Sequence, residues 1–190
     1  MDITIKQLDS SLLDDFLYYF DKVAFTDNPG WSGCYCQFYH FEGKRSEWVK
    51  RTGKQNRNAA IDLITSGHMN GFLAYKNEKP VGWCNTNLKE RFPLLVQDKD
   101  INYPYKGKIA SIVCFIIAPE YRKQGIARKL LQFINESYKS KKFDLLEAYP
   151  RKNVKSDAHN YKGPLSLYES EGFSIYKEFE NFYIVRKNLK

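Results

Sequence analysis

Apolar residues follow first a strand-like and then a helix-like spacing between positions 108 and 138. Residues 109–118 form a nearly unbroken, β-branched apolar run that ends before Pro119, which predicts a buried strand. After a short turn the apolar side chains recur one helical turn apart, at Ile126, Ala127, Leu130, Leu131, Ile134 and Tyr138. The pattern therefore predicts a strand, a turn and an amphipathic helix in succession.

Shorter segments on both sides of this unit show the same two spacings. Alternation predicts a first strand at residues 3–8, and Asp9 and Ser10 can cap a helix that ends near Phe25. Further strands are predicted at residues 71–75, 80–86, 143–150, 173–177 and 182–185, and further helices at residues 57–66 and 165–171. Residues 88–105 and 151–163 are predicted to be loops. The right-handed crossover rule makes strand 143–150 parallel to strand 109–118.

The turn between the long strand and its helix carries groups that bind anions. The first backbone N–H groups of a helix lack intrahelical partners, and the helix dipole is positive there. Gly125 lets a ligand approach the backbone, Ala127 is nearly as small, and Arg122 and Lys123 add positive charge. The residue spacing excludes a P-loop and a dinucleotide fingerprint. The sequence predicts a phosphate site, with an ordinary basic helix start as the alternative.

Two segments resemble motifs of the GCN5-related N-acetyltransferase (GNAT) family. APEYRKQGIARKLL, residues 118–131, is similar to the family pattern R/Q-x-x-G-x-G/A, with Arg122, Gly125 and Ala127 at its three positions. LYESEGF, residues 167–173, resembles a second family motif, L-Y-E-x-x-G-F. The order and separation of the motifs agree, and the resemblance covers roughly residues 70–188.

The resemblance implies an α/β fold with a mixed, mostly antiparallel central sheet. That sheet is splayed between two parallel strands and flanked by helices, the acyl-CoA N-acyltransferase fold. The expected organisation is one GNAT domain over residues 1–190. Residues 1–70 would supply an N-terminal strand, helices and an acceptor-side loop, and residues 71–190 the acetyl-CoA-binding core.

The resemblance also implies how acetyl-CoA would bind. The backbone of Phe115 would donate to the thioester oxygen, and Ile117 would pair with the pantetheine arm. The phosphate groups would lie on the turn and helix start, which contain Arg122, Lys123, Gln124, Gly125, Ile126, Ala127 and Arg128. Many family members carry an asparagine seven residues before the motif tyrosine. Tyr161 stands at that position here, and Asn160 is beside it.

Two side chains are candidates for the proton transfers. Tyr168 aligns with the tyrosine that protonates the departing thiolate in the family, and its alternative is a core tyrosine. Glu147, near the end of its strand, is the candidate base, although strand glutamates are often solvated or ion-paired. Attack by the neutral amine, or a base acting through water, stays open.

Residues 31–41 are dense in aromatic side chains and follow neither spacing. They are predicted either to form a small aromatic core under a long loop or to wall the acceptor pocket. In the second case Trp31, Tyr35 and Tyr39 would bind the acceptor, together with Trp83 from the strand 80–86. His40 is interpreted as a half-buried structural residue, with an acceptor-binding role as the alternative.

Composition and charge narrow the possible partners. The 190 residues include 30 Lys and Arg against 22 Asp and Glu, a net charge of +8. No cluster of five basic residues occurs, which argues against nucleic acid and favours a polyanionic co-substrate such as acetyl-CoA. The four cysteines, Cys34, Cys36, Cys84 and Cys114, are expected to be reduced thiols, and no metal site is predicted. No transmembrane or signal segment is visible, so a cytoplasmic location is expected, as a monomer or a homodimer.

Together these features predict an acetyl-CoA-dependent N-acetyltransferase that moves an acetyl group to a primary amine of a small molecule. The amine would attack directly in a ternary complex. A protein or peptide acceptor is one alternative, and a non-catalytic module that senses acetyl-CoA is another. The sequence does not identify the acceptor.

Overall fold

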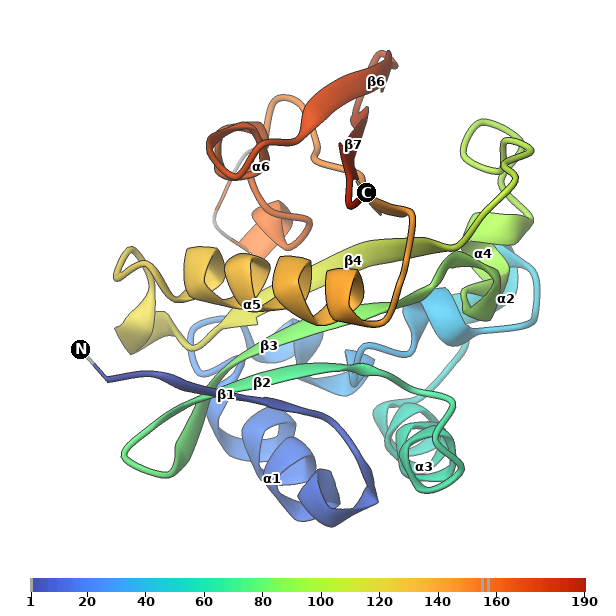
Figure 1. Ribbon diagram of the computed structural model, residues 1–190. Coiled ribbons are helices and arrows are strands. Elements are labelled where there is room, and N and C mark those ends of the chain that lie inside the picture. The colour runs from blue at the N-terminus through green and yellow to red at the C-terminus, as the bar shows by residue number, and fades with distance from the viewer. Residues whose placement is uncertain (1, 155, 157) are drawn as a thin grey trace.

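The computed structural model describes residues 2–154, 156 and 158–190, and its centre is one seven-stranded sheet (Figure 1). The strand order is β1-β2-β3-β4-β5-β7-β6. The strands are β1 (Thr4–Gln7), β2 (Gly71–Lys76), β3 (Lys79–Leu88), β4 (Ile109–Ile117), β5 (Leu145–Ala148), β6 (Ser174–Glu178) and β7 (Tyr183–Asn188). β4 and β5 run parallel, and the other neighbouring pairs run antiparallel. The expected mixed, mostly antiparallel sheet is confirmed.

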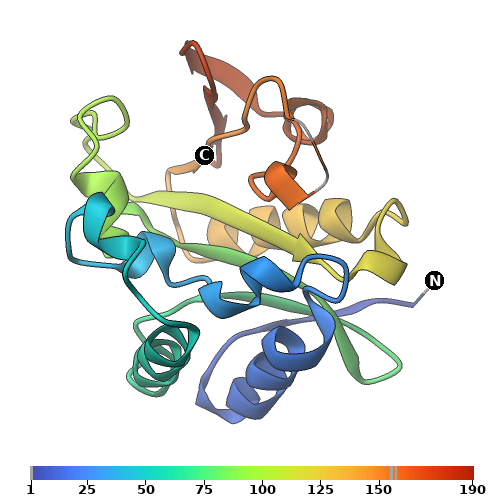
Figure 2. The ribbon, with the colours of Figure 1, turned by 180° about the vertical axis from the view of Figure 1, so that it is seen from behind.

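Helices cover both faces of this sheet. They are α1 (Leu13–Tyr18), α2 (Arg45–Trp48), α3 (Gly53–Thr65), α4 (Pro93–Val96), α5 (Ile126–Ser140) and α6 (Leu165–Ser170). α5 lies on one face, where its buried residues pack with alternate residues of β2, β3 and β4. α1 and α3 lie on the other face, as Figure 2 shows from behind. The strands therefore separate two hydrophobic cores.

β4 is paired on both edges along only part of its length. β5 pairs with Ile109–Ile112, whereas β3 follows β4 from Ala110 to Ile117. The β3–β4 register shifts between Asn85 and Thr86, which is the mark of a β-bulge. Beyond Ile112 the edge of β4 that faces β5 is thus open to another part of the chain or to a ligand.

Several predicted boundaries are corrected by the structure. The first helix is not continuous to Phe25: a 3₁₀ turn (Ser10–Leu12) precedes α1, and a π-helical segment (Tyr19–Val23) follows it. α3 begins four residues before the predicted start, because Thr52 and Gln55 form a capping box there. The predicted loop 88–105 contains α4. Within the predicted loop 151–163, residues 155 and 157 lie outside the described residues.

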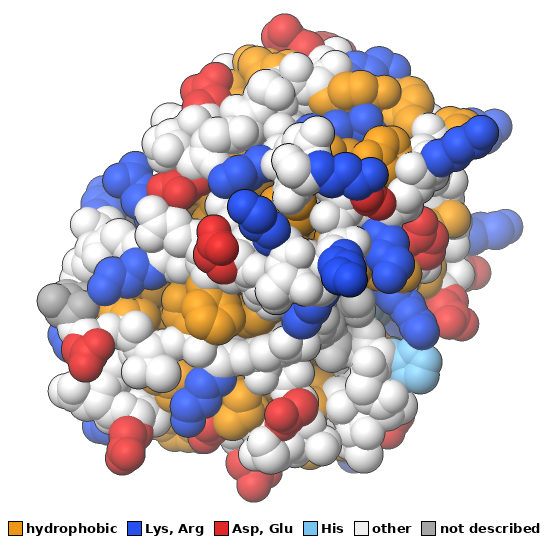
Figure 3. All heavy atoms as spheres, in the orientation of Figure 1, with side chains coloured by type: hydrophobic (Ala, Val, Ile, Leu, Met, Phe, Trp, Pro, Cys, Tyr) orange, Lys and Arg blue, Asp and Glu red, His pale blue; other side chains and the backbone are white. Residues whose placement is uncertain are grey.

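The surface in Figure 3 shows Lys and Arg side chains spread over one face among Asp and Glu side chains. In the part of the chain that the structure describes, no helix has both the length and the apolar character needed to cross a membrane.

Candidate functional site

A cavity of about 730 Å³ lies against the open half of β4. Its floor is formed by residues 114–117 of that strand. Part of its wall comes from the aromatic segment, residues 30–39, which Figure 2 shows lying across β4, and Arg151, His159 and Tyr161 form a further part. Segments far apart in the sequence therefore enclose one site.

Two of the aromatic residues predicted to bind an acceptor do line this cavity. Trp31 sits at its mouth, and its ring makes edge contacts with His159 and Tyr161 at centroid distances of 5.4 and 5.8 Å. Tyr39 also lines the cavity, although its side chain is largely buried. The wall is thus partly aromatic.

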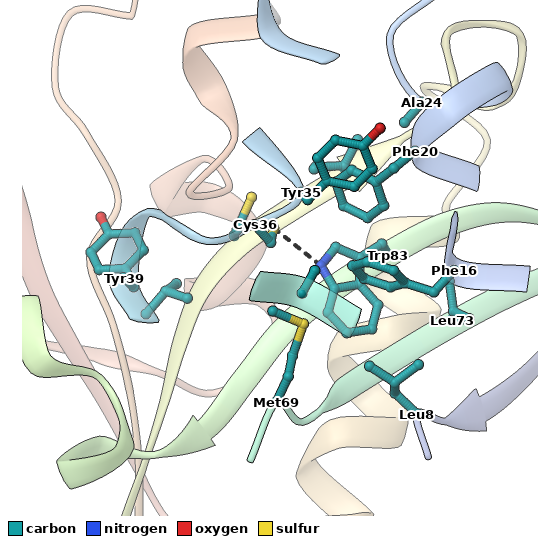
Figure 4. Packing of buried hydrophobic residues seen from close by; sticks show 14 of the residues in the cluster. Leu8, Phe16, Phe20, Ala24, Tyr35, Cys36, Tyr39, Met69, Leu73 and Trp83 are labelled. Carbon is teal, nitrogen blue, oxygen red and sulfur yellow. Dashed lines mark hydrogen bonds between the residues drawn. The ribbon is translucent and has the colours of Figure 1, made fainter. Parts of the chain in front are cut away.

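The other two predicted acceptor residues lie in the core, which corrects their assignment. Trp83 is fully buried on β3, where it donates to Cys36 Sγ at 3.2 Å and packs edge-on against Phe16 (Figure 4). Tyr35 stacks on Phe20 and donates its hydroxyl hydrogen to Asp21. The backbone of Tyr35 has φ +44°, and this left-handed turn directs the side chain away from the cavity. Aromatic density therefore marks both the wall and the core behind it.

The predicted phosphate turn leads into α5 as the sequence pattern indicates. Gly125 is the N-cap residue with φ +81°, a conformation that favours glycine, and a Cβ at this position would meet no atom within 4 Å. Lys123 also has positive φ. The side chain of Ile126 is buried in the core and Ala127 packs against it, so the space at the turn lies over backbone N–H groups. This geometry fits an anionic group.

Three polar side chains at the turn and the helix start, those of Arg122, Gln124 and Arg128, already have protein partners. Arg122 donates from Nε to Ile117 O at 3.1 Å and forms an ion pair with Asp27. Gln124 donates to Glu120 O. Arg128 reaches from α5 to the end of α6, where its Nη2 lies 3.3 Å from Ser170 Oγ and its Nε lies 3.4 Å from Glu171 Oε1. Side-chain charge at the turn is thus partly engaged, and the backbone groups are its most available donors.

The loop before α6 occupies the open edge of β4. Phe115 N donates to Tyr161 O at 2.5 Å, so the amide assigned to the thioester oxygen is bonded to this loop. The Tyr168 hydroxyl donates to Lys162 O at 2.6 Å, and burial raises the Tyr168 pKa well above its usual value. Asn160 Oδ1 is buried with no hydrogen-bond partner among the described residues. Tyr168, Phe115 and Asn160 are therefore brought together, around a loop that must exchange these bonds when a ligand enters.

Glu147 does not reach this site, which corrects its assignment as a base. Its carboxylate is fully buried. Glu147 lies on β5 opposite Ser111, in the part of β4 that is paired on both edges and is called the closed half here. Oε1 accepts from Lys89 Nζ and from the Tyr149 hydroxyl, each at 2.7 Å, and Oε2 accepts from Arg186 Nε at 2.7 Å. A carboxylate held by two cations has no oxygen left to take a proton from a ligand. It is a structural ion pair.

Three thiols line the cavity, and two of them have raised pKa values. Cys34, Cys36 and Cys114 belong to its lining. Burial raises the pKa of Cys34 to about 12. A hydrogen bond with Cys36, together with burial, raises the pKa of Cys114 well above its usual value. Cys34 and Cys114 are therefore neutral thiols at neutral pH, unlike activated nucleophilic cysteines.

Several polar residues in the cavity wall were not predicted from the sequence. Asn85 on β3 is fully buried, and its Oδ1 has no partner within the described chain. Arg51 and Arg151 bring positive charge, and Asn56 is fixed between Arg51 Nε and Gly33 O at 2.6 and 2.8 Å. An asparagine directly after the apolar residues 80–84 was the one available signal for Asn85.

Comparison with known proteins places this geometry among acetyltransferases. Residues 35–162 match the model of the acetyltransferase (GNAT) family. No curated protein matches the sequence. Solved structures share the fold across the whole chain. The PaiA N-acetyltransferase of Thermoplasma acidophilum, in complex with coenzyme A, is 17% identical with a TM-score of 0.58, and 99% of each chain is covered.

Two further neighbours lead to the same fold. An N-acetyltransferase of Staphylococcus aureus Mu50 is 14% identical with a TM-score of 0.57, and all of both chains is covered, 100% each. The ribosomal-protein-S18-alanine N-acetyltransferase of Escherichia coli is 15% identical with a TM-score of 0.52, covering 100% of this chain and 95% of that one. Identities of this size show a shared fold and leave the acceptor open.

Proposed function

Because this chain belongs to the acetyltransferase (GNAT) family, we propose that it is an acetyl-CoA-dependent N-acetyltransferase whose acceptor is a primary amine of a small molecule. The observation that carries the proposal is the cavity at the open half of β4, whose lining includes both Arg122 of the turn and the aromatic segment. Its volume of about 730 Å³ is within the usual range of small-molecule sites, roughly 300–1,000 Å³.

Acetyl-CoA would be held first by its phosphate groups. The start of the fifteen-residue helix α5 offers unpaired backbone N–H groups, and Gly125 leaves the space above them open. The pantetheine arm would then follow the open edge of β4 toward Phe115. The unpartnered Oδ1 of Asn160 supports this path, since an amide N–H of the arm could satisfy it.

In the reaction a carbon–nitrogen bond forms, and a carbon–sulfur bond and one N–H bond break. The amine nitrogen attacks the thioester carbonyl carbon and the sulfur leaves as a thiolate, while the nitrogen, positively charged after the attack, loses one proton to solvent. Phe115 N, once released from Tyr161 O, would donate to the carbonyl oxygen as negative charge develops on it. Such a donor is typically worth about 10²–10³ in rate.

The departing thiolate needs a proton, and Tyr168 is the proposed donor. Burial raises its pKa well above the usual value, so the hydroxyl is protonated throughout the neutral range. The Tyr168 hydroxyl donates a hydrogen bond to Lys162 O. Lys162 belongs to the same loop as Tyr161, whose carbonyl oxygen accepts from Phe115 N. Displacement of this loop would free both donors together. The unactivated thiols of the cavity favour direct attack over a covalent enzyme intermediate.

The proposal is tested by Gly125→Glu, which fills the space above the helix start with a negatively charged side chain. Isothermal titration calorimetry is expected to show at least a 100-fold loss of acetyl-CoA affinity, and release of the coenzyme A thiol in the presence of mixed primary amines should stop. Gly67→Glu is the matched control, because Gly67 also has a positive φ, +70°, and open space around it, but follows α3. Equal affinity in both folded variants would contradict the phosphate site.

A further inference from the structure

An unsatisfied hydrogen-bond acceptor lies in the cavity wall, close to the point where β4 stops pairing with β5. Asn85 is aligned with Cys114 across the β3–β4 ladder, next to the register shift. Its side chain is fully buried and lines the cavity, yet Oδ1 has no hydrogen-bond partner among the described residues. A buried carbonyl oxygen without a partner has lost its hydration without compensation, so a donor from a ligand would be strongly favoured here.

Neighbouring groups fix which end of the Asn85 amide faces the cavity. Nδ2 donates to Cys36 O at 3.2 Å and lies 3.4 Å from His40 Nε2. Burial lowers the pKa of His40 to about 4, so its ring is neutral, and the ring also bonds to the Arg91 backbone. A neutral ring that donates to that backbone presents Nε2 as an acceptor. Both Nδ2 hydrogens are then used, and a flipped amide would set Oδ1 against Cys36 O.

The charges around the cavity are all of one sign. Its lining includes Arg51, Arg122 and Arg151, and no carboxylate is found among the described lining residues. Arg122 is already paired with Asp27 outside the lining. Arg51 donates to Asn56 and Gln55, whereas the Arg151 guanidinium lies 5.0 Å from the Tyr161 ring and has no ion-pair partner in the described chain. The wall thus provides positive charge that an anion could balance.

We propose that the acceptor is a small amine that carries a carboxylate and an aromatic or large apolar body. Its nitrogen would donate to Asn85 Oδ1, its body would lie against Trp31 and Tyr39, and its carboxylate would meet Arg151. Asn85 is thereby an acceptor-positioning residue and Arg151 a specificity-determining residue. This inference rests on the proposed acetyl transfer.

The same arrangement accounts for the loss of the amine proton without a carboxylate base. Desolvation beside the buried Asn85 and like charge from the lining arginines both disfavour an ammonium ion. The bound amine is therefore held in its neutral, nucleophilic form, and the proton leaves to solvent before attack. Polyamines and other polycations are excluded by the same two effects, since each added ammonium group would face Arg51 and Arg151.

The first experiment compares acceptors that differ only in the carboxylate. Coenzyme A release is measured with L-phenylalanine, L-tryptophan, L-tyrosine, L-leucine and L-methionine, with the decarboxylated amine of each, and with spermidine. The expected result is a kcat/KM at least 10-fold higher for the carboxylate-bearing member of the best pair, with no turnover of spermidine. Turnover of the decarboxylated amines or spermidine alone would overturn the inference while leaving acetyl transfer in place.

Variants then test which residues bind the amine and the carboxylate of the acceptor. Asn85→Leu is expected to raise the acceptor KM about 10- to 100-fold with acetyl-CoA affinity unchanged, because only the donor site is lost. Asn135→Leu is the matched control: Asn135 Oδ1 is also buried without a partner in the described residues, but it lies on α5. Arg151→Gln should remove the preference for the carboxylate-bearing member of each pair. Lys152→Gln is its control, because it makes the same charge change at the neighbouring residue.

The outcomes distinguish the acceptor class from acetyl transfer itself. No turnover with any carboxylate-bearing amine overturns the assigned acceptor class. Failure to bind acetyl-CoA, measured by calorimetry, instead contradicts the proposed acetyl transfer. An unchanged acceptor KM in a folded Asn85→Leu variant would mean that water satisfies Oδ1, and an equal rise in Asn135→Leu would mean a general loss of packing. Either result overturns the role of Asn85.

Discussion

Beside the two halves of β4, buried polar groups differ in whether they have hydrogen-bond partners. Along Ile109–Ile112 the strand is enclosed by β3 and β5, and the carboxylate of Glu147 accepts hydrogen bonds from Lys89, Tyr149 and Arg186. Along residues 113–117 β5 is gone and a cavity takes its place. There Asn85 Oδ1 and Asn160 Oδ1 are buried with no partner among the described residues.

This difference separates stability from binding within one strand. A satisfied buried network contributes rigidity, and breaking it exposes the full cost of desolvated charge. An unsatisfied group costs free energy in the folded state and can recover it only from a ligand. Substitutions in the closed half should therefore change unfolding, and those in the open half should change kinetics.

The largest effect is expected in the closed half, from Glu147→Ala. It leaves the buried ammonium of Lys89 without its carboxylate, so the free energy of unfolding should fall by about 3–5 kcal/mol, measured by chemical denaturation. Glu178→Ala is the control. That carboxylate pairs with Lys152 but is 60% exposed, and its loss should cost less than about 1 kcal/mol. Similar costs for both variants would contradict the distinction.

His40, which lies beside Asn85 in the open half, makes stability depend on pH, because burial lowers its pKa from 6.5 to about 4. Above pH 6.5 neither state binds the proton. Between pH 6.5 and 4 the unfolded chain binds it and the folded chain does not, so stability falls toward acid, by about 3 kcal/mol in full. His40→Gln should remove this part of the acid loss in denaturation curves taken from pH 7 to 4. The exposed His68→Gln should keep it, and parallel loss in all three proteins would contradict the assignment.

The sequence predicted the regular parts of this comparison. The apolar run of β4 and the helical spacing of α5 depend on local pattern, and the parallel β4–β5 pair depends on the handedness of the crossover. Both are confirmed. Predicted boundaries failed where side chains changed the local structure, as at the Thr52 cap of α3.

The direction of side chains in the site was less predictable. The aromatic segment was expected to bind an acceptor as a unit, but a left-handed turn sends Tyr35 into the core while Trp31 and Tyr39 line the cavity. Glu147 gave no sign of its partners, because Lys89 and Arg186 are distant in sequence. Whether a buried polar atom has a partner is a property of the packed structure and has no local pattern.

In the open half, Tyr168→Phe is expected to lower kcat about 100-fold, the usual worth of a positioned acid. The substitution keeps the ring that packs against Phe115 and Phe173 and removes only the donor. Acetyl-CoA affinity should change little and stability by about 1 kcal/mol, since the hydroxyl makes one hydrogen bond, to Lys162 O. Steady-state kinetics and calorimetry on the same preparation separate these effects.

The matched control for this variant is Tyr138→Phe. Tyr138 is a buried tyrosine whose hydroxyl has one weak partner, Thr86 Oγ1 at 3.4 Å, but it lies on α5 away from the cavity. Burial raises the pKa of Tyr168 well above 10, so wild type and variant should have parallel pH profiles below pH 10 and differ only in height. A Tyr168→Phe enzyme that keeps most of its kcat would show that solvent protonates the thiolate. The tyrosine would then serve the closed state of the loop, and catalysis in the open half would rest on Phe115 N and on the position of the amine.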